Sequence, residues 1–135
     1  MRCLLIISFL LSLTFSLNAQ CSKIHFINTS LSFAEQKARK ESKYIFVFVY
    51  ELGESKAEFF ESAIFYKRNI CRKFNENFIN VKAKSTSSLG RNLIRQHRFD
   101  TLPAFLILDK NGRLVAKSDD LKGTNDLLRF ADKAR

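Results

Sequence analysis

Tyr44-Ile45-Phe46-Val47-Phe48-Val49-Tyr50 is an unbroken run of β-branched and aromatic residues. A run without alternating polar positions is typical of a strand that is covered on both faces. A capping-box pattern, Ser32 with Glu35, predicts a helix before the run. Ser55 with Glu58 repeats this pattern after it and predicts a second helix. The run is therefore expected to be the central strand of a sheet that carries helices.

The other elements follow in an order that suits one mixed sheet. Strands are predicted at 24–26, 44–50, 78–83, 103–108 and 113–117. Helices are predicted at 32–42, from 55 onward, at 67–77 as a continuation or a separate helix, through 89–94, and at 124–134. Asn111-Gly112 favours a hairpin turn between the last two strands, because both residues tolerate positive φ angles. The order predicts an α/β fold in which helices flank a mixed central sheet.

Spacing also predicts which helical side chains face the core. In the second helix these are Phe59, Phe60, Ala63 and Ile64, at separations of one, three and four. In the helix at 67–77 they are Ile70, Cys71 and Phe74.

The first residues form the pattern of a secretory signal peptide. Arg2 gives a positive start, Leu4 to Leu17 is apolar apart from Ser and Thr, and Ala19 is a small residue suited to cleavage. We expect a signal peptide at 1–19 and one domain at 20–135, secreted or periplasmic. The apolar run is too short to span a bilayer comfortably. Lipid attachment at Cys21 is the less favoured alternative, because the bulky Gln20 would precede the cleavage site.

The formal net charge is +10, with Lys and Arg spread along the whole chain of 135 residues. This distribution indicates a solvated cationic surface with weak binding to anionic surfaces, rather than a specific nucleic-acid site. His25 and His97 lack nearby residues at metal-ligand spacing, so no metal site is predicted. No glycine-rich loop suited to a phosphate is present, and no cofactor is expected.

Four segments in order resemble the thioredoxin-like superfamily, and in particular its bacterial extracytoplasmic members. They are Ser32–Ala38, Tyr44–Tyr50, Phe74–Val81 and Thr101–Leu108. The resemblance extends over about residues 22–135 and implies the three-layer thioredoxin-like fold.

The positions of the two redox cysteines are occupied by other residues. Phe65 matches a phenylalanine that is frequent after the redox motif, and counting back from it places the thiol positions at Glu54 and Ala57. Gly53 stands where the family often has Trp, and Phe48 where many members bury an acid. Exchange needs a thiolate at a helix N-terminus and a second thiol one turn later. The resemblance therefore implies the fold without the dithiol, with a degenerate active site.

A carboxylate is itself favoured at a helix start, so Glu54 can supply the negative charge that a thiolate would carry there. Ser55 can satisfy a free N–H at the same end. Pro103 is the only proline of the chain. The resemblance implies that its peptide bond is cis and that the backbone of Leu102 pairs with an extended substrate strand. Glu54, Ser55, Leu102 and Pro103 are thus the predicted binding residues for a peptide or protein partner.

The alternative is a thiol-disulfide oxidoreductase that works through Cys71, with or without Cys21. Cys3 leaves with the signal peptide, so these two are the cysteines of the mature chain. The place of Cys71 on an apolar helix face favours packing over reactivity. Whether the two cysteines pair stays open, because spacing alone cannot decide it.

Overall fold

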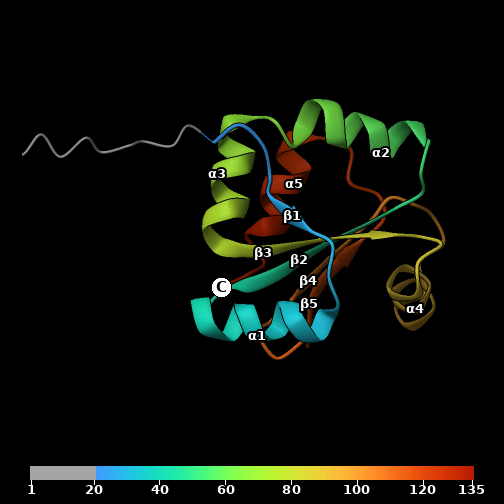
Figure 1. The fold of residues 1–135 in the computed structure, drawn as a ribbon. Coiled ribbons are helices and arrows are strands. Elements are labelled where there is room, and N and C mark those ends of the chain that lie inside the picture. The colour runs from blue at the N-terminus through green and yellow to red at the C-terminus, as the bar shows by residue number, and fades with distance from the viewer. Residues whose placement is uncertain (1–20) are drawn as a thin grey trace, which may run out of the picture.

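The computed structural model describes residues 21–135, so the signal peptide predicted at 1–19 lies outside the described residues. A sheet of five strands in the order β1-β3-β2-β4-β5 lies between two layers of helices (Figure 1). This arrangement confirms the α/β fold expected from the sequence. The strands are β1 (Phe26–Ile27), β2 (Tyr44–Tyr50), β3 (Phe78–Lys84), β4 (Ala104–Leu108) and β5 (Leu114–Ser118). The helices are α1 (Leu31–Glu41), α2 (Ser55–Phe59) with its π-helical continuation η1 (Phe60–Ile64), α3 (Arg68–Asn77), α4 (Ser88–His97) and α5 (Thr124–Ala131).

The sheet is parallel on one side of β2 and antiparallel on the other. β1, β3 and β2 run parallel, whereas β4 and β5 pair antiparallel. β1 is short: it pairs only with Asn80 and Val81, while β3 continues to Lys84. The amides of Ile24 and His25 are bound by Phe65 O and Asn75 Oδ1 instead of a strand, which is why β1 begins later than predicted.

Alternation along β2 separates two cores, as expected for a strand covered on both faces. Phe46 and Phe48 point to the layer of α2, α3 and α5, where Phe74 and Phe105 pack beside them. The intervening Ile45, Val47 and Val49 point to the layer of α1 and α4. Each fully buried side chain of this size contributes roughly 1.5–3 kcal/mol through burial, so the five buried residues of β2 stabilise both cores.

Two predicted helix caps were wrong by one or two residues. The N-cap of α1 is Ser30, whose side chain accepts a hydrogen bond from the Phe33 amide at 3.2 Å, rather than Ser32. The N-cap of α2 is Glu54 rather than Ser55. In both cases the residue that caps has extended backbone, and the predicted serine already lies in the first helical turn.

The predicted inward face of α2 was half correct. Phe60 and Ile64 are buried, but Ala63 is exposed and Phe59 is 46% exposed. The buried face is formed by Ala57, Phe60 and Ile64, at separations of three and four. The π-helical turn, closed by Phe65 N donating to Phe60 O at 2.9 Å, then directs Phe65 into the core as well.

Candidate functional site

The turn after β2 ends in a carboxylate that caps α2. Gly53 has φ 81°, a conformation that glycine adopts readily, and the Glu54 amide then donates to Glu51 O at 3.2 Å. The two carboxylate oxygens of Glu54 accept hydrogen bonds from the amides of Lys56, at 3.0 Å, and Ala57, at 2.8 Å. In a redox-active site, the free N–H groups at this helix end would stabilise a thiolate. Here the Glu54 carboxylate binds them, and a carboxylate cannot form a disulfide.

The neighbouring predicted residues contribute no side chain to this cap. Ser55 is the first residue of α2 and its side chain is exposed. Ala57 is 2% exposed, so its methyl group packs into the core at the second thiol position. Phe48 is fully buried among other rings.

The predicted Leu102–Pro103 segment leaves the same end of the sheet as this turn. Val49 pairs with Ala104, so the residues after β2 and those before β4 lie side by side in the pairing register. The Leu102–Pro103 peptide bond is cis, Pro103 is buried and Leu102 is half-buried. Leu52, in the turn before Glu54, is 76% exposed. The structure therefore brings the predicted binding residues to one end of the sheet, with apolar side chains beside them.

A charged pair that sequence reasoning missed lies next to Phe48. Lys82 is the register neighbour of Phe48 on β3, and its Nζ is 2.6 Å from Glu61 Oε1 on η1. The same Nζ lies 4.6 Å from the ring centroid of Tyr50. The available signal was Lys82 itself, a lysine within a largely buried strand, because such a lysine requires a partner when its stem is buried.

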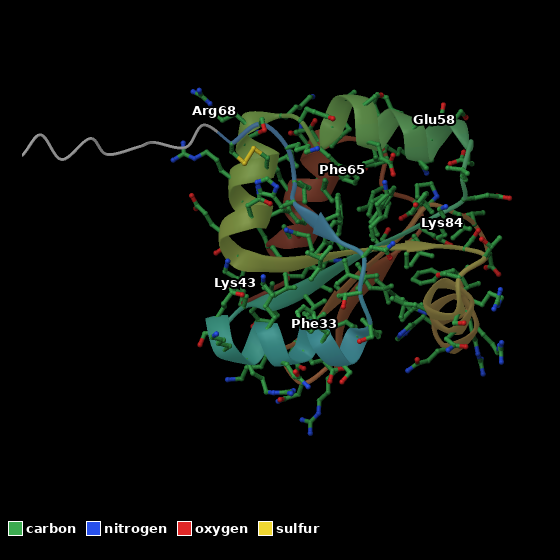
Figure 2. The ribbon with its side chains drawn as sticks, viewed as in Figure 1. Phe33, Lys43, Glu58, Phe65, Arg68 and Lys84 are labelled. Atoms are coloured by element: carbon green, nitrogen blue, oxygen red, sulfur yellow. A yellow bond between two sulfur atoms is a disulfide. The ribbon has the colours of Figure 1, made fainter. Side chains whose placement is uncertain are left out.

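Cys21 and Cys71 form a disulfide, visible as the yellow bond on α3 near Arg68 (Figure 2). Their Cα atoms are 5.9 Å apart across a sequence separation of 50. Cys71 is 0% exposed and Cys21 is half-buried. The burial of Cys71 agrees with the predicted apolar helix face, and the bond to Cys21 answers the question that spacing left open.

One turn along α3, Asn75 holds the same N-terminal segment. Its Oδ1 accepts from the His25 amide at 2.8 Å, and its Nδ2 donates to Lys23 O at 2.9 Å. The same Nδ2 lies 3.2 Å from Cys21 Sγ. The carboxamide therefore pairs with the segment as a neighbouring strand would.

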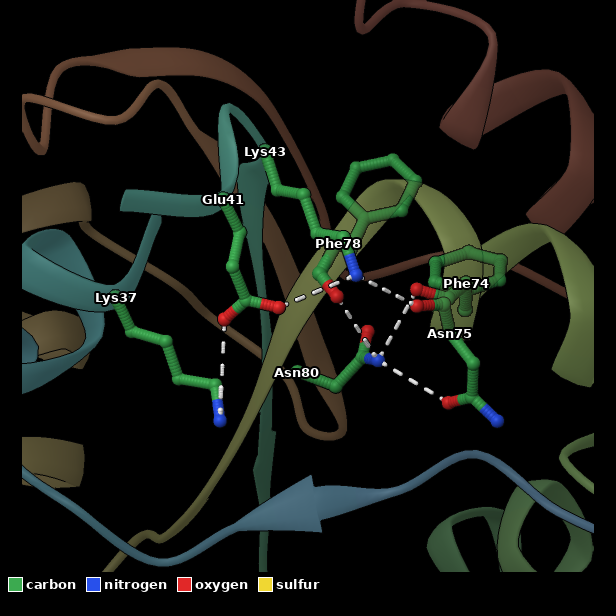
Figure 3. Close-up of polar contacts among 7 residues, drawn as sticks. All are labelled: Lys37, Glu41, Lys43, Phe74, Asn75, Phe78 and Asn80. Atoms are coloured by element: carbon green, nitrogen blue, oxygen red, sulfur yellow. Dashed lines mark hydrogen bonds and ion pairs between the residues drawn. The ribbon is translucent and has the colours of Figure 1, made fainter. Parts of the chain in front are cut away.

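Asn80, 3% exposed on β3, connects this contact to the core (Figure 3). Its Nδ2 donates to Phe74 O at 3.2 Å and lies 3.5 Å from Asn75 Oδ1, while Lys43 Nζ donates to Asn75 O at 3.1 Å. Asn80 Oδ1 is buried without a hydrogen-bond partner among the described residues. These bonds fix the end of α3 against the sheet.

Within residues 21–135, no group of three or more His, Cys, Asp and Glu side chains could hold a metal ion. Over the same residues, no helix has the length and apolar character needed to cross a membrane.

Comparison with solved structures identifies the fold as thioredoxin-like. A protein of Bacteroides thetaiotaomicron assigned as a disulphide isomerase superposes with a TM-score of 0.74 at 22% identity, covering 82% of this chain and 91% of that one. A thioredoxin from Thermus thermophilus gives 0.70 at 13% identity, covering 82% and 86%. The C-terminal domain of DsbD from Neisseria meningitidis, in its oxidised form, gives 0.64 at 7% identity, covering 82% and 100%. No protein-family model and no curated protein sequence matches the chain.

These likenesses span nearly all of the described residues and confirm the thioredoxin-like fold that the sequence resemblance implied. At such low identity they show the fold alone, and function must be argued from the site.

Proposed function

We propose that this protein is an exported, redox-inactive thioredoxin-fold module that binds an extended peptide or a protein partner. The carrying observation is Glu54, whose carboxylate accepts two amide hydrogen bonds at the start of α2. Ala57, at the second thiol position, is a buried methyl group. The scaffold around the two positions is kept, but no residue there can form a mixed disulfide.

The surface beside Glu54 supports a binding role. Leu52 is largely exposed and Leu102 is half-buried at the same end of the sheet. Exposed apolar side chains beside a backbone segment at a sheet end suit an extended peptide, which supplies both apolar groups and backbone hydrogen bonds.

Export is supported by the signal-peptide pattern at 1–19 and by the disulfide, because disulfides persist in oxidising compartments. A lipid on Cys21 and the bond to Cys71 would both use Cys21 Sγ. The pairing therefore favours a secreted or periplasmic protein without this anchor.

The alternative, an oxidoreductase that uses Cys71 with Cys21, is favoured by one observation, the pairing of the two cysteines. An external thiolate would attack Cys21 Sγ, form a mixed disulfide there and release Cys71 as a thiolate. Complete burial of Cys71 argues against repeated turnover, since thiol exchange requires access. We expect no acceleration of insulin reduction by dithiothreitol, whether in the wild type or in Cys71→Ser. Acceleration that disappears in Cys71→Ser would establish the enzyme.

The binding module is tested with peptides selected from a random library on the purified mature protein. Leu52→Asp and Leu102→Asp should each weaken binding of the selected peptide by about tenfold or more, as loss of an apolar anchor does. Leu114→Asp is the matched control and should bind normally, because Leu114 is also exposed but pairs with Leu108, at the other end of β4 from Pro103. Unchanged affinity in both site variants would refute the proposal.

A further inference from the structure

The exposed face of α4 carries arginines without a carboxylate among them. Arg91 and Arg95 lie one turn apart in the helix, so their side chains are neighbours on its surface, and Arg98 follows as the C-cap. All three residues are exposed, and we call them the α4 arginine face. Figure 1 shows α4 at the margin of the molecule, and in Figure 2 side chains that end in nitrogen extend outward from it.

α4 differs in charge from the other helices of the described residues. Each of the others, with η1 counted as part of α2, contains at least one Asp or Glu, whereas α4 contains none. In α1, for example, Lys37 and Arg39 lie 3.9 Å and 4.0 Å from a carboxylate oxygen of their own helix. Within residues 21–135, Arg91, Arg95 and Arg98 form no ion pair. Their positive charge is therefore available to a ligand outside the protein.

The groups beside the α4 arginine face leave this charge in excess. Arg91 NH1 donates to Thr86 O, which ties the guanidinium to the start of α4 and leaves its other N–H groups as donors. Lys117 Nζ donates to His97 O at 2.6 Å and adds an ammonium group at the end of the helix. Asp100, the first carboxylate after α4, forms no ion pair among the described residues. Positive groups therefore outnumber carboxylates around the helix.

The chemistry of the α4 arginine face matches phosphate groups on a surface. Guanidinium groups bind phosphate through paired hydrogen bonds. The large apolar side chains that are exposed in residues 21–135 lie on other elements than α4. The face thus offers no ring on which the bases of a single strand could stack, and no apolar anchor for the centre of a protein interface. An extended peptide needs a strand edge or a groove, whereas a bilayer requires only positive charge near its headgroups.

We propose that the α4 arginine face docks the protein on an anionic lipid surface, with its guanidinium groups against the headgroup phosphates. This inference rests on the proposed export, which places the chain beside membranes rather than with duplex nucleic acid. Because α4 presents no large exposed apolar side chain for insertion, charge alone holds the protein on the bilayer. Binding is therefore reversible and is weakened by salt.

The test is cosedimentation of the purified mature protein with vesicles of phosphatidylglycerol and phosphatidylcholine in equal parts. We expect binding to these vesicles, little to phosphatidylcholine alone, and release as NaCl rises from about 0.05 M to about 0.5 M. Each cationic side chain near an anionic surface strengthens binding by about fivefold. The double variant Arg91→Gln, Arg95→Gln should therefore weaken binding by about twentyfold or more.

The matched control is the double variant Arg68→Gln, Arg72→Gln. It removes two exposed arginines at the same spacing from α3, which lies on the opposite side of the molecule (Figure 1). It lowers the net charge equally and should weaken vesicle binding by less than about threefold. Thermal unfolding of both double variants verifies that each is folded.

Equal losses in the two double variants would show attraction by net charge alone and would overturn the proposal. Binding to phosphatidylcholine alone that is as strong as binding to the mixed vesicles would also overturn it. So would tighter binding of a DNA duplex that releases the protein from the vesicles, because the face would then be a nucleic-acid site. These outcomes leave the peptide site at the turn intact, since neither double variant alters 51–57 or Leu102.

Discussion

Glu54 shows how one residue can retain the electrostatics of a site and remove its chemistry. A helix N-terminus favours a negative charge, and a thiolate or a carboxylate satisfies that preference equally. Only the thiolate is a good nucleophile toward a disulfide. Both oxygens of Glu54 are instead used to accept the amides of Lys56 and Ala57, so its role is to stabilise α2.

We predict that Glu54→Ala lowers the free energy of unfolding by about 1 kcal/mol, the usual effect of losing an N-cap. Glu54→Asp should lose less, because aspartate is among the preferred capping residues. Urea unfolding of the purified variants measures both. Glu51→Ala is the control, since the Glu51 side chain is exposed and only its backbone serves the turn. A control as destabilised as Glu54→Ala would contradict the capping role.

The prediction that Ser32 caps α1 was wrong because Glu35, the second residue of the capping box, makes a contact outside this segment. Ser32 with Glu35 matches the capping box, but Glu35 lies against Gly112 in the turn between β4 and β5 and 4.0 Å from Arg39 NH1. With Glu35 engaged there, α1 begins one residue after Ser30. The local sequence around α1 does not predict the contact between Glu35 and Gly112, because the two residues are far apart in the chain.

At the scale of elements, α4 packs tightly against the end of β3. A Cβ added at Gly90 would lie 1.8 Å from the carbonyl oxygen of Lys84, which is backbone and cannot move aside easily. Gly90 is thus required for α4 to pack on the sheet, even though glycine weakens a helix interior.

We predict that Gly90→Ala destabilises the protein by about 2 kcal/mol, because overpacking outweighs the gain in helix propensity. Gly123→Ala is the matched substitution: no heavy atom lies within 4 Å of its added Cβ, and its backbone is extended. It should change stability by less than about 1 kcal/mol, because Gly123 is the N-cap of α5 and alanine is a less favoured cap than glycine. The urea concentration at which half of the protein is unfolded is measured for both variants and for wild type. Equal stability of Gly90→Ala and wild type would mean that α4 can shift without cost.

The end of α4 makes stability depend on pH. Burial and the nearby Lys117 ammonium lower the pKa of His97 below its usual 6.5. As the pH falls below about 6.5, the unfolded chain therefore binds more protons at His97 than the folded chain does. The contribution of neutral His97 to the free energy of unfolding is complete above pH 6.5 and is lost as the pH falls. We expect wild type to lose more stability than His97→Gln between about pH 8 and about pH 5. Parallel urea titrations measure this difference, and identical pH profiles would contradict it.

For the whole molecule, the local sequence pattern was sufficient to predict the order of helices and strands. It was not sufficient to predict the side-chain contacts between different elements. β2 was predicted with the bounds that the structure has, because an unbroken apolar run requires burial on both faces. The four predicted binding residues were placed through the resemblance. The Lys82–Glu61 pair and the contacts of Asn75 depend on how helices lie over the sheet, which no single segment encodes.

The disulfide is the covalent contact among those that hold the N-terminal segment. It closes a loop of 50 residues between Cys21 and Cys71, and Asn75 adds hydrogen bonds to Lys23 and His25 one turn along α3. Closing a loop of that length restricts the unfolded chain and is worth about 4 kcal/mol in the chain-entropy account.

We therefore predict that Cys21→Ser lowers the free energy of unfolding by up to about 4 kcal/mol. Cys21 is chosen because it is half-buried, whereas a hydroxyl at the fully buried Cys71 would add a second cost. Urea unfolding of the variant should match that of wild type held in dithiothreitol, and Ser22→Ala should behave as untreated wild type. Hydrogen exchange of the His25 amide, bonded to Asn75 Oδ1 at 2.8 Å, should accelerate in the variant. Unchanged stability together with unchanged exchange would mean that Ile24 and Asn75 hold the segment without the covalent bond.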